Sequence, residues 1–175
     1  MKRVLILYKS KYGAAKKYAG MIKEALGGDV FDVKDFEKAD LVQYDAVVFA
    51  GAIYASGISG LKVLRSKWPL LKQKRVAVFC VGASPYDEKA IREVKQNNLK
   101  DELKDIPMFY GRGAWDESAM TFKDRTLCKL LQKMISGKSE AECEPWMKAL
   151  LSASGKKCDW TDPKYLEPLI AYMNR

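Results

Sequence analysis

Three short loops rich in glycine and small residues carry the groups with which this chain could bind a ligand. The first loop, with the start of the helix that follows it, comprises Ser10, Lys11, Tyr12, Gly13, Ala14 and Ala15. Residues 15–26 place apolar side chains at helical spacing, so free backbone N–H groups and a positive dipole end lie at the head of this helix. That combination favours a phosphate, and Ser10 adds a hydroxyl donor.

The second and third loops offer aromatic rings and backbone groups. Their candidate binding residues are Ala52, Ile53, Tyr54 and Ala55 in the second loop, and Gly82, Ala83, Ser84 and Tyr86 in the third. Tyr54 is suited to stacking on a planar ring, and the third loop adds a second tyrosine and backbone groups for the edge of a heterocycle. Each loop has an ordinary alternative, because loop tyrosines commonly pack locally and the first loop also fits any β–α connection.

The elements around these loops predict how they are brought together. Apolar runs at residues 4–8, 30–33, 46–50, 76–81 and 106–110 predict buried strands. Helical patterns at residues 15–26, 59–68 and 87–99 separate them. The second of these helices is predicted to stop before Pro69, and Asp87 is a candidate N-cap of the third. The predicted fold is α/β, a three-layer doubly wound five-stranded parallel sheet in the order 2-1-3-4-5. A ligand then sits beyond the carboxyl ends of the strands, at the switch between strands one and three.

Composition limits the possible functions. The 175 residues suit a single domain, residues 1–175, and no apolar run is long enough to span a bilayer, so we expect a cytoplasmic protein. The chain has no histidine, and none of its four cysteines forms a C-x-x-C pair, which argues against a metal site, a disulfide framework and His-based catalysis. The net charge of +9 favours an anionic partner. Because no recognition motif is present, we expect no nucleic-acid partner.

The C-terminal third is less regular. Residues 113–160 are predicted to form a helical insertion or extension, with an amphipathic helix at 122–135 and a partly helical stretch near 145–151. Basic side chains flank the apolar stripe of the first helix: Lys123, Arg125, Lys129, Lys133 and Lys138. This segment could dock on an anionic membrane, although an ordinary helix packed on the domain explains the same pattern. A last helix should begin near Asp162-Pro163, with Pro168 causing a kink or a later start.

The order of these motifs resembles the flavodoxin-like proteins over nearly the whole chain, and most closely the branch of menaquinone-dependent protoporphyrinogen dehydrogenases. The resemblance is carried by Tyr8-Lys9-Ser10-Lys11-Tyr12-Gly13, Gly51-Ala52-Ile53-Tyr54, Tyr110-Gly111-Arg112-Gly113-Ala114, Asp124-Arg125 and Asp159-Trp160-Thr161-Asp162. It implies an FMN cofactor, an oxidoreductase or electron-transfer function, and a quinone or other redox partner.

The resemblance also contains a departure. Flavodoxins usually carry hydroxyl residues at three positions of the phosphate loop, and this chain has Tyr12 and Ala15 at two of them. FMN binding could therefore be loose, with Lys9 or Lys11 compensating through charge. Three functions stay open: a quinone-linked enzyme with an anionic substrate, a plain electron carrier, and a degenerate module with weak FMN binding. No side chain is an evident catalytic acid or base, and the oligomeric state is not indicated.

Overall fold

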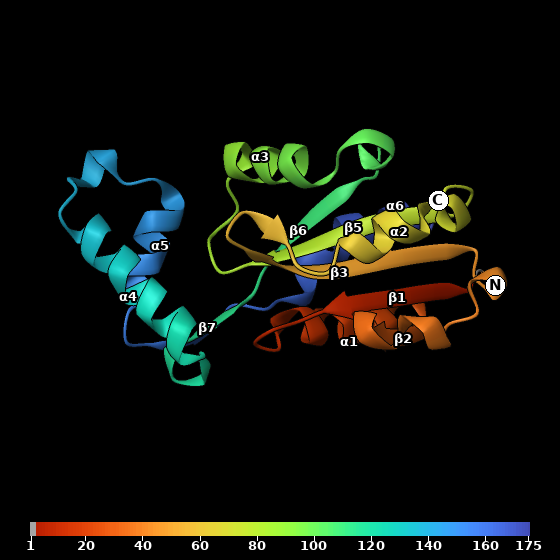
Figure 1. Cartoon of the computed structure of the whole chain (residues 1–175), viewed down its shortest axis with the longest axis horizontal. Coiled ribbons are helices and arrows are strands. Elements are labelled where there is room, and N and C mark those ends of the chain that lie inside the picture. Colours follow the sequence, from red (N-terminus) through yellow and green to blue (C-terminus); the bar gives the residue numbers. More distant parts are fainter. Residues whose placement is uncertain (1–2) are drawn as a thin grey trace.

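A parallel sheet forms the centre of the protein in the computed structural model, which describes residues 3–175. Its strand order is β2-β1-β3-β5-β6, and the short β4 (Gly57–Ile58) pairs antiparallel with the end of β3. The five parallel strands are β1 Val4–Lys9, β2 Asp29–Asp32, β3 Ala46–Tyr54, β5 Arg75–Gly82 and β6 Met108–Arg112. With the extra β4 set aside, this is the predicted doubly wound order (Figure 1).

Helices cover both faces of the sheet, as the continuous apolar runs predicted. One face carries α2 (Lys62–Leu71) and α3 (Glu88–Asn98), which pack on alternate residues such as Leu5 and Leu7. The other face carries α1 (Ala14–Leu26) and α6 (Glu167–Met173), which pack on residues such as Ile6. Short 3-10 turns connect these elements: η1 Val33–Lys38, η2 Leu41–Gln43, η3 Asp101–Leu103, η4 Glu117–Ala119, η5 Glu140–Glu142 and η6 Pro163–Leu166.

Local capping confirms several predicted boundaries. The Asp87 carboxylate accepts a hydrogen bond from the Ala90 N–H at 2.7 Å and caps α3. Asp162 caps η6, and α6 starts later, at Glu167, so Pro168 falls in its first turn where no N–H is needed.

Two boundaries differ from the sequence prediction. Helix α2 runs through Pro69 to Leu71 rather than ending at Trp68, because the side chains of Leu64 and Leu71 are both fully buried and anchor the helix on either side of the proline. Strand β3 continues to Tyr54 through the predicted second loop, and the chain turns back into β4 at Ala55 and Ser56. Both turn residues have positive φ, 47° and 64°, which a two-residue hairpin of matching twist requires.

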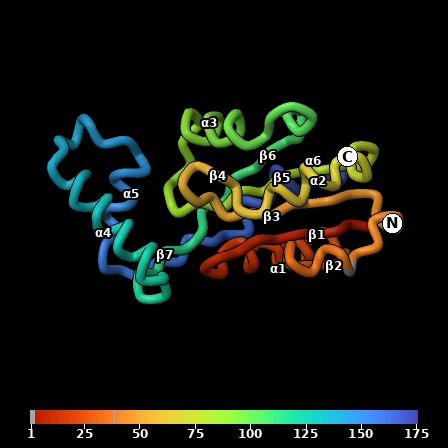
Figure 2. Tube along the Cα trace, in the orientation of Figure 1, coloured from red at the N-terminus to blue at the C-terminus, as the bar shows by residue number. Residues whose placement is uncertain are grey.

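A separate group of elements lies between β6 and α6. It consists of β7 (Ala114–Asp116), α4 (Phe122–Ser136), α5 (Pro145–Ala153) and β8 (Lys157–Asp159), and β7 pairs antiparallel with β8. Figures 1 and 2 show α4 and α5 beyond the carboxyl ends of the parallel strands, away from the helices that cover the sheet. We call residues 114–159 the α4–α5 insert. Within residues 3–175, no helix is both long and apolar enough to cross a membrane.

Candidate functional site

The head of α1 keeps the features that the sequence predicted for anion binding. Gly13 is its N-cap with φ 96°, a conformation that favours glycine, and its N–H donates to the Ser10 Oγ at 3.0 Å. No side chain caps α1, and its first turn carries no acidic residue. The backbone N–H groups at this helix start are therefore suited to an anion.

A buried carboxylate lies against the first loop. The side chain of Asp124, at the start of α4, is only 5% exposed, and Asp124 is the one buried charged residue in the described part of the chain. It accepts hydrogen bonds from the hydroxyl of Tyr12 and, at 2.8 Å, from that of Tyr54, and its Oδ2 lies 2.5 Å from the Lys11 ammonium. These bonds, led by the one from Lys11, lower the pKa of the Asp124 carboxyl to about 2, so it is ionised at neutral pH.

The same contacts engage the side chains predicted to hold a ligand. The pKa of Lys11 is raised, chiefly by its hydrogen bond to Asp124, so its charge is shared with a carboxylate inside the chain. The Lys11 Nζ also lies 4.6 Å from the centroid of the Tyr54 ring. One face of the ring predicted to stack on a ligand is thus already covered by a cation.

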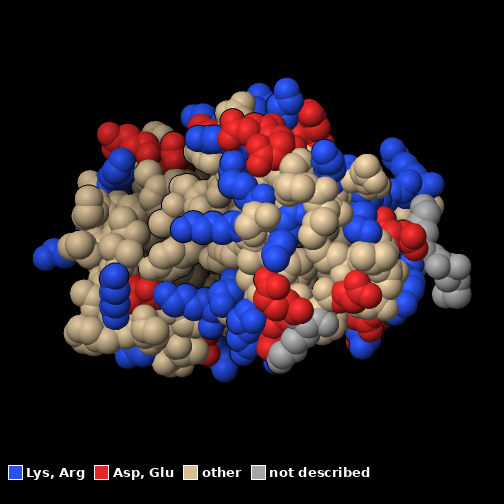
Figure 3. Space-filling model, turned by 45° about the vertical axis from the view of Figure 1, so that its right-hand side comes forward, with Lys and Arg blue, Asp and Glu red and all other residues tan. Residues whose placement is uncertain are grey.

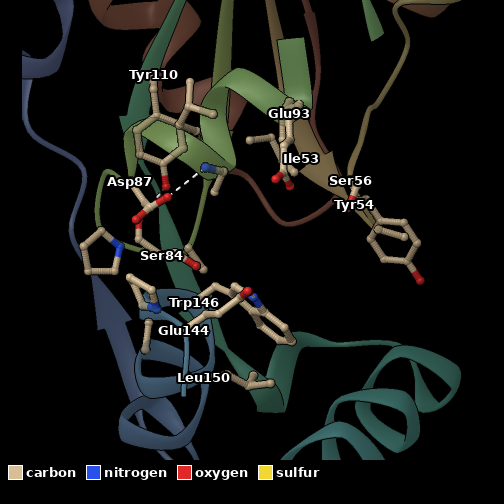
Figure 4. Close-up of a pocket in the computed structure, with 18 of the residues that line it drawn as sticks. Ile53, Tyr54, Ser56, Ser84, Asp87, Glu93, Tyr110, Glu144, Trp146 and Leu150 are labelled. Carbon is tan, nitrogen blue, oxygen red and sulfur yellow. Dashed lines mark hydrogen bonds between the residues drawn. The ribbon is translucent and has the colours of Figure 1, made fainter. Parts of the chain in front are cut away.

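A cavity of about 620 Å³ lies beside this cluster, between the strand ends and the α4–α5 insert. From the sheet side it is lined by the β3–β4 turn and by the loop after β5, including Ile53, Ser84 and Asp87. From the insert it is lined by α4 and α5, including Trp146 and Leu150. Figure 4 shows Glu144, Trp146 and Leu150 facing the residues of the sheet side, with Tyr54 at the margin. Its size is in the range of small-molecule and cofactor sites.

The three predicted loops are placed differently around this cavity. Five of the predicted residues line it: Ile53, Tyr54, Ala55, Ala83 and Ser84. Ala52, Gly82 and Tyr86 are outside its lining, and so are the six residues Ser10, Lys11, Tyr12, Gly13, Ala14 and Ala15. The ring of Tyr86 is exposed and tilted against that of Tyr110, with centroids 6.1 Å apart. Tyr54 is the residue that joins the first loop, through Asp124, to the cavity.

Three tryptophans in and next to the α4–α5 insert face the cavity and were not among the predicted site residues. Trp115, Trp146 and Trp160 all line the cavity. Their distribution in the sequence could have indicated this role, since three of the four tryptophans fall within residues 115–160. Arg112 supports this wall, because its guanidinium carbon lies 3.8 Å from the Trp160 ring centroid and its Nε–H donates to the Ala83 carbonyl at 3.0 Å.

A second, more open recess of about 430 Å³ adjoins the cavity and shares Pro85, Pro145 and Ala149 with it. Two basic side chains, Arg112 and Lys148, contribute to its wall. The cavity is mostly apolar and aromatic, with Asp87, Glu93 and Glu144 also in its lining, whereas the charged side chains of this recess are basic. Together they suit a ligand with a flat apolar body in the cavity and an acidic group at the recess. Lys and Arg side chains also gather around a hollow of the surface in Figure 3.

Comparison with known families is consistent with this arrangement. The model of the Flavodoxin domain matches residues 5–142, most of the chain. The chain belongs to this flavodoxin-domain family. The match begins in β1 and ends inside the α4–α5 insert, so it includes the head of α1, the β3–β4 turn, the loop after β5 and Asp124. No curated protein matches the chain.

Solved structures with a related fold include three proteins of low sequence identity. The Trp repressor binding protein from Bacillus subtilis is 15% identical, with a TM-score of 0.47 over 63% of this chain and 85% of its own. A flavoprotein in complex with FMN from Lactobacillus acidophilus NCFM is 16% identical, with a TM-score of 0.46 over 64% and 93%. A putative flavoprotein from Bacteroides eggerthii DSM 20697 is 17% identical, with a TM-score of 0.48 over 79% and 100%.

The residues of this flavodoxin domain fit a flavin mononucleotide at both ends. The uncapped head of α1 suits a phosphate, and the cavity beside the β3–β4 turn is large and apolar enough for a planar ring. The one feature that opposes a phosphate is the ionised carboxylate of Asp124, which is hydrogen-bonded to two side chains of the phosphate loop.

Proposed function

We propose that this protein is a flavoprotein that binds FMN at the carboxyl ends of β1, β3 and β5. The observation that carries the proposal is the pairing of an uncapped helix start after β1 with an apolar cavity after β3 and β5, on the flavodoxin-domain sheet. In a doubly wound sheet of this order, ligands bind at that switch point.

Each part of the site has a distinct role in this proposal. The N–H groups of Ala14 and Ala15 would bind the phosphate, and the β3–β4 turn together with the loop after β5 would hold the ring. Trp146 and the rest of the insert wall would exclude water from the ring. The bound flavin would supply the redox chemistry, and the chain would orient it and set its electrostatic surroundings.

Titration of the flavin-free protein with FMN, followed by fluorescence quenching, tests this function. We expect saturable binding of FMN at one site and a changed visible spectrum of the bound flavin. Replacement of Gly13 by Val should abolish that binding, because a β-branched residue disfavours a φ of 96° and the phosphate loop would rearrange. Gly137, at the end of α4, has a negative φ and open space around its Cα, so Gly137→Val serves as a control. A protein that stays colourless at high FMN would refute the proposal and favour a degenerate module.

A finer proposal concerns the reaction. The resemblance to menaquinone-dependent protoporphyrinogen dehydrogenases suggests an oxidoreductase that passes an electron pair and its protons from an anionic organic substrate to a quinone. The tryptophan-lined cavity and the adjoining recess with Arg112 and Lys148 support an apolar substrate with carboxylates. Turnover with protoporphyrinogen and menaquinone tests it. Reduction and reoxidation by protein partners, without turnover of either compound, would favour a plain electron carrier.

The exposed face of α4 supports a peripheral contact with an anionic membrane. Phe122, Leu130 and Met134 are 85%, 55% and 65% exposed, and the exposed Lys129 and Lys133 lie on the same helix. Apolar side chains flanked by lysines suit the interface of anionic lipids. Sedimentation with phosphatidylglycerol vesicles should bring down the wild-type protein, and Leu130→Gln with Met134→Gln should leave it in the supernatant. Leu70→Gln, at a 59% exposed position on α2, is the control, and equal loss in both variants would refute the contact.

A further inference from the structure

Asp124 is the point at which the α4–α5 insert is attached to the predicted phosphate loop. Its carboxylate holds α4 to Lys11 and Tyr12 of the first loop and to Tyr54 at the end of β3. Its partners are remote in sequence: Tyr12 is 112 residues away and Tyr54 is 70 residues away. The N–H of Thr121, the N-cap of α4, also donates to the Tyr12 hydroxyl at 3.3 Å.

The carboxylate is bonded to the groups that a phosphate at this place would use. Lys11 and Tyr12 immediately precede Gly13, the N-cap of α1, so both side chains start beside the predicted phosphate position. The Lys11 ammonium contacts Asp124 at 2.5 Å, although it is still 45% exposed. A phosphate bound at the α1 head would face this carboxylate across the same ammonium, and two anions sharing one cation repel each other.

We infer that Asp124 is an internal anion that competes with the phosphate of the cofactor for Lys11 and Tyr12, and thereby sets the preference of the site for phosphorylated over unphosphorylated flavin. The inference rests on the proposed FMN binding and deepens it. In a loop that already departs from the usual flavodoxin pattern at Tyr12 and Ala15, this competition also limits how far Lys11 can compensate through its charge. The ring half of the site is not affected by this competition, because riboflavin has no phosphate to be repelled.

The test compares FMN and riboflavin as ligands of the wild-type protein and of Asp124→Asn, with fluorescence quenching as the readout. Removal of the charge should tighten FMN about tenfold and change riboflavin by less than about twofold, since only FMN carries the anion. Asp101→Asn is the matched control. It removes an equal charge at a 72% exposed site paired with Arg65, and asparagine tolerates the φ of 54° there. This control should leave both affinities unchanged.

Several results would overturn the inference. If Asp124→Asn weakens both ligands equally, Asp124 only positions Tyr54 and the insert. If riboflavin binds and FMN affinity does not rise, the competition is absent while the ring site stands. If neither flavin binds to any variant, the proposed function fails and the inference falls with it.

A second variant does not depend on whether Asp124→Asn folds. Lys11→Gln leaves the Asp124 carboxylate without its ammonium partner, beside the predicted phosphate position. This substitution should weaken FMN about tenfold while leaving riboflavin within about twofold of wild type. Unchanged FMN affinity in Lys11→Gln would show that the ammonium is not shared, and this would overturn the inference. Far-UV circular dichroism confirms that each variant is folded.

Discussion

Arg112 offers a direct test of how the wall of the cavity is held. Its guanidinium stacks on Trp160 at 3.8 Å, and its Nε–H donates at 3.0 Å to the carbonyl of Ala83 in the loop after β5. Arg112→Met keeps most of the side-chain volume and removes both interactions. A partly desolvated cation–π contact is worth about 1 kcal/mol, and a hydrogen bond from a charged donor at least about 1.5 kcal/mol.

The expected loss of stability follows from these two contacts. Because the guanidinium is half-buried, solvent weakens both terms, and we expect Arg112→Met to lower the free energy of unfolding by about 2 kcal/mol. With an m-value of about 2 kcal/mol/M in urea, the midpoint should fall by about 1 M. The urea midpoint of Arg112→Lys should lie between those of the wild-type protein and Arg112→Met, because an ammonium keeps the charge but cannot reproduce the planar stack.

Urea unfolding followed by circular dichroism measures this difference. The control is Arg92→Met on α3, where the arginine is exposed and forms an i,i+4 ion pair with Glu88. That substitution should cost no more than about 0.5 kcal/mol. Equal midpoints for the two methionine variants would refute the reasoning, since they would show that the stacked and hydrogen-bonded arginine contributes no more than a surface one.

Other consequences concern buried hydroxyls, caps and acid stability. Tyr18→Phe should lower the free energy of unfolding by about 1–2 kcal/mol in urea, because the fully buried Tyr18 hydroxyl donates to the Arg112 carbonyl at 2.6 Å. Asp87→Ala should lower the free energy of unfolding by about 1 kcal/mol through loss of the α3 N-cap, whereas Asp87→Asn should change it little because asparagine also caps helices. Thermal melts of the two variants measure this difference. The pKa of Asp124, about 2 in the folded chain, is below its ordinary value, so its contribution to stability is present above about pH 4 and is lost as the pH falls toward 2. Acid titration of Asp124→Asn should therefore show a flatter loss of stability over that range.

The sheet could be predicted because its information is local. Each central strand is a short apolar run between polar loops, and this pattern alone distinguishes a doubly buried strand from an edge. The α3 cap at Asp87 was predicted for the same reason, since a capping residue acts within three positions. The β3–β4 hairpin was missed because Ala55 and Ser56 are not the asparagine and glycine that usually signal two positive φ angles.

The site was only partly predictable because it depends on contacts between distant residues. Local pattern predicted correctly that the head of α1 and the turn after β3 lie at one end of the sheet. It could not show that Asp124 would lie against Tyr12 and Tyr54, since a carboxylate in the first turn of an amphipathic helix ordinarily favours the helix dipole and faces solvent. Only packing of the insert against the strand ends buries that carboxylate and gives it three donors.

The position of the insert has a consequence for any ligand of this protein. The cavity has one wall from the sheet and one from α4 and α5, so a molecule bound there contacts both. Asp124 connects α4 to Tyr54 on the sheet side of the cavity, and Arg112 of β6 connects Ala83 on the sheet side to Trp160, which also lines the cavity. A ligand that contacts both walls stabilises the arrangement in which the two walls are packed together. A substitution at either connection should then alter ligand affinity even though the substituted residue does not contact the ligand. Arg112→Met should accordingly weaken riboflavin as well as FMN, which distinguishes it from the phosphate-selective effect expected at Asp124.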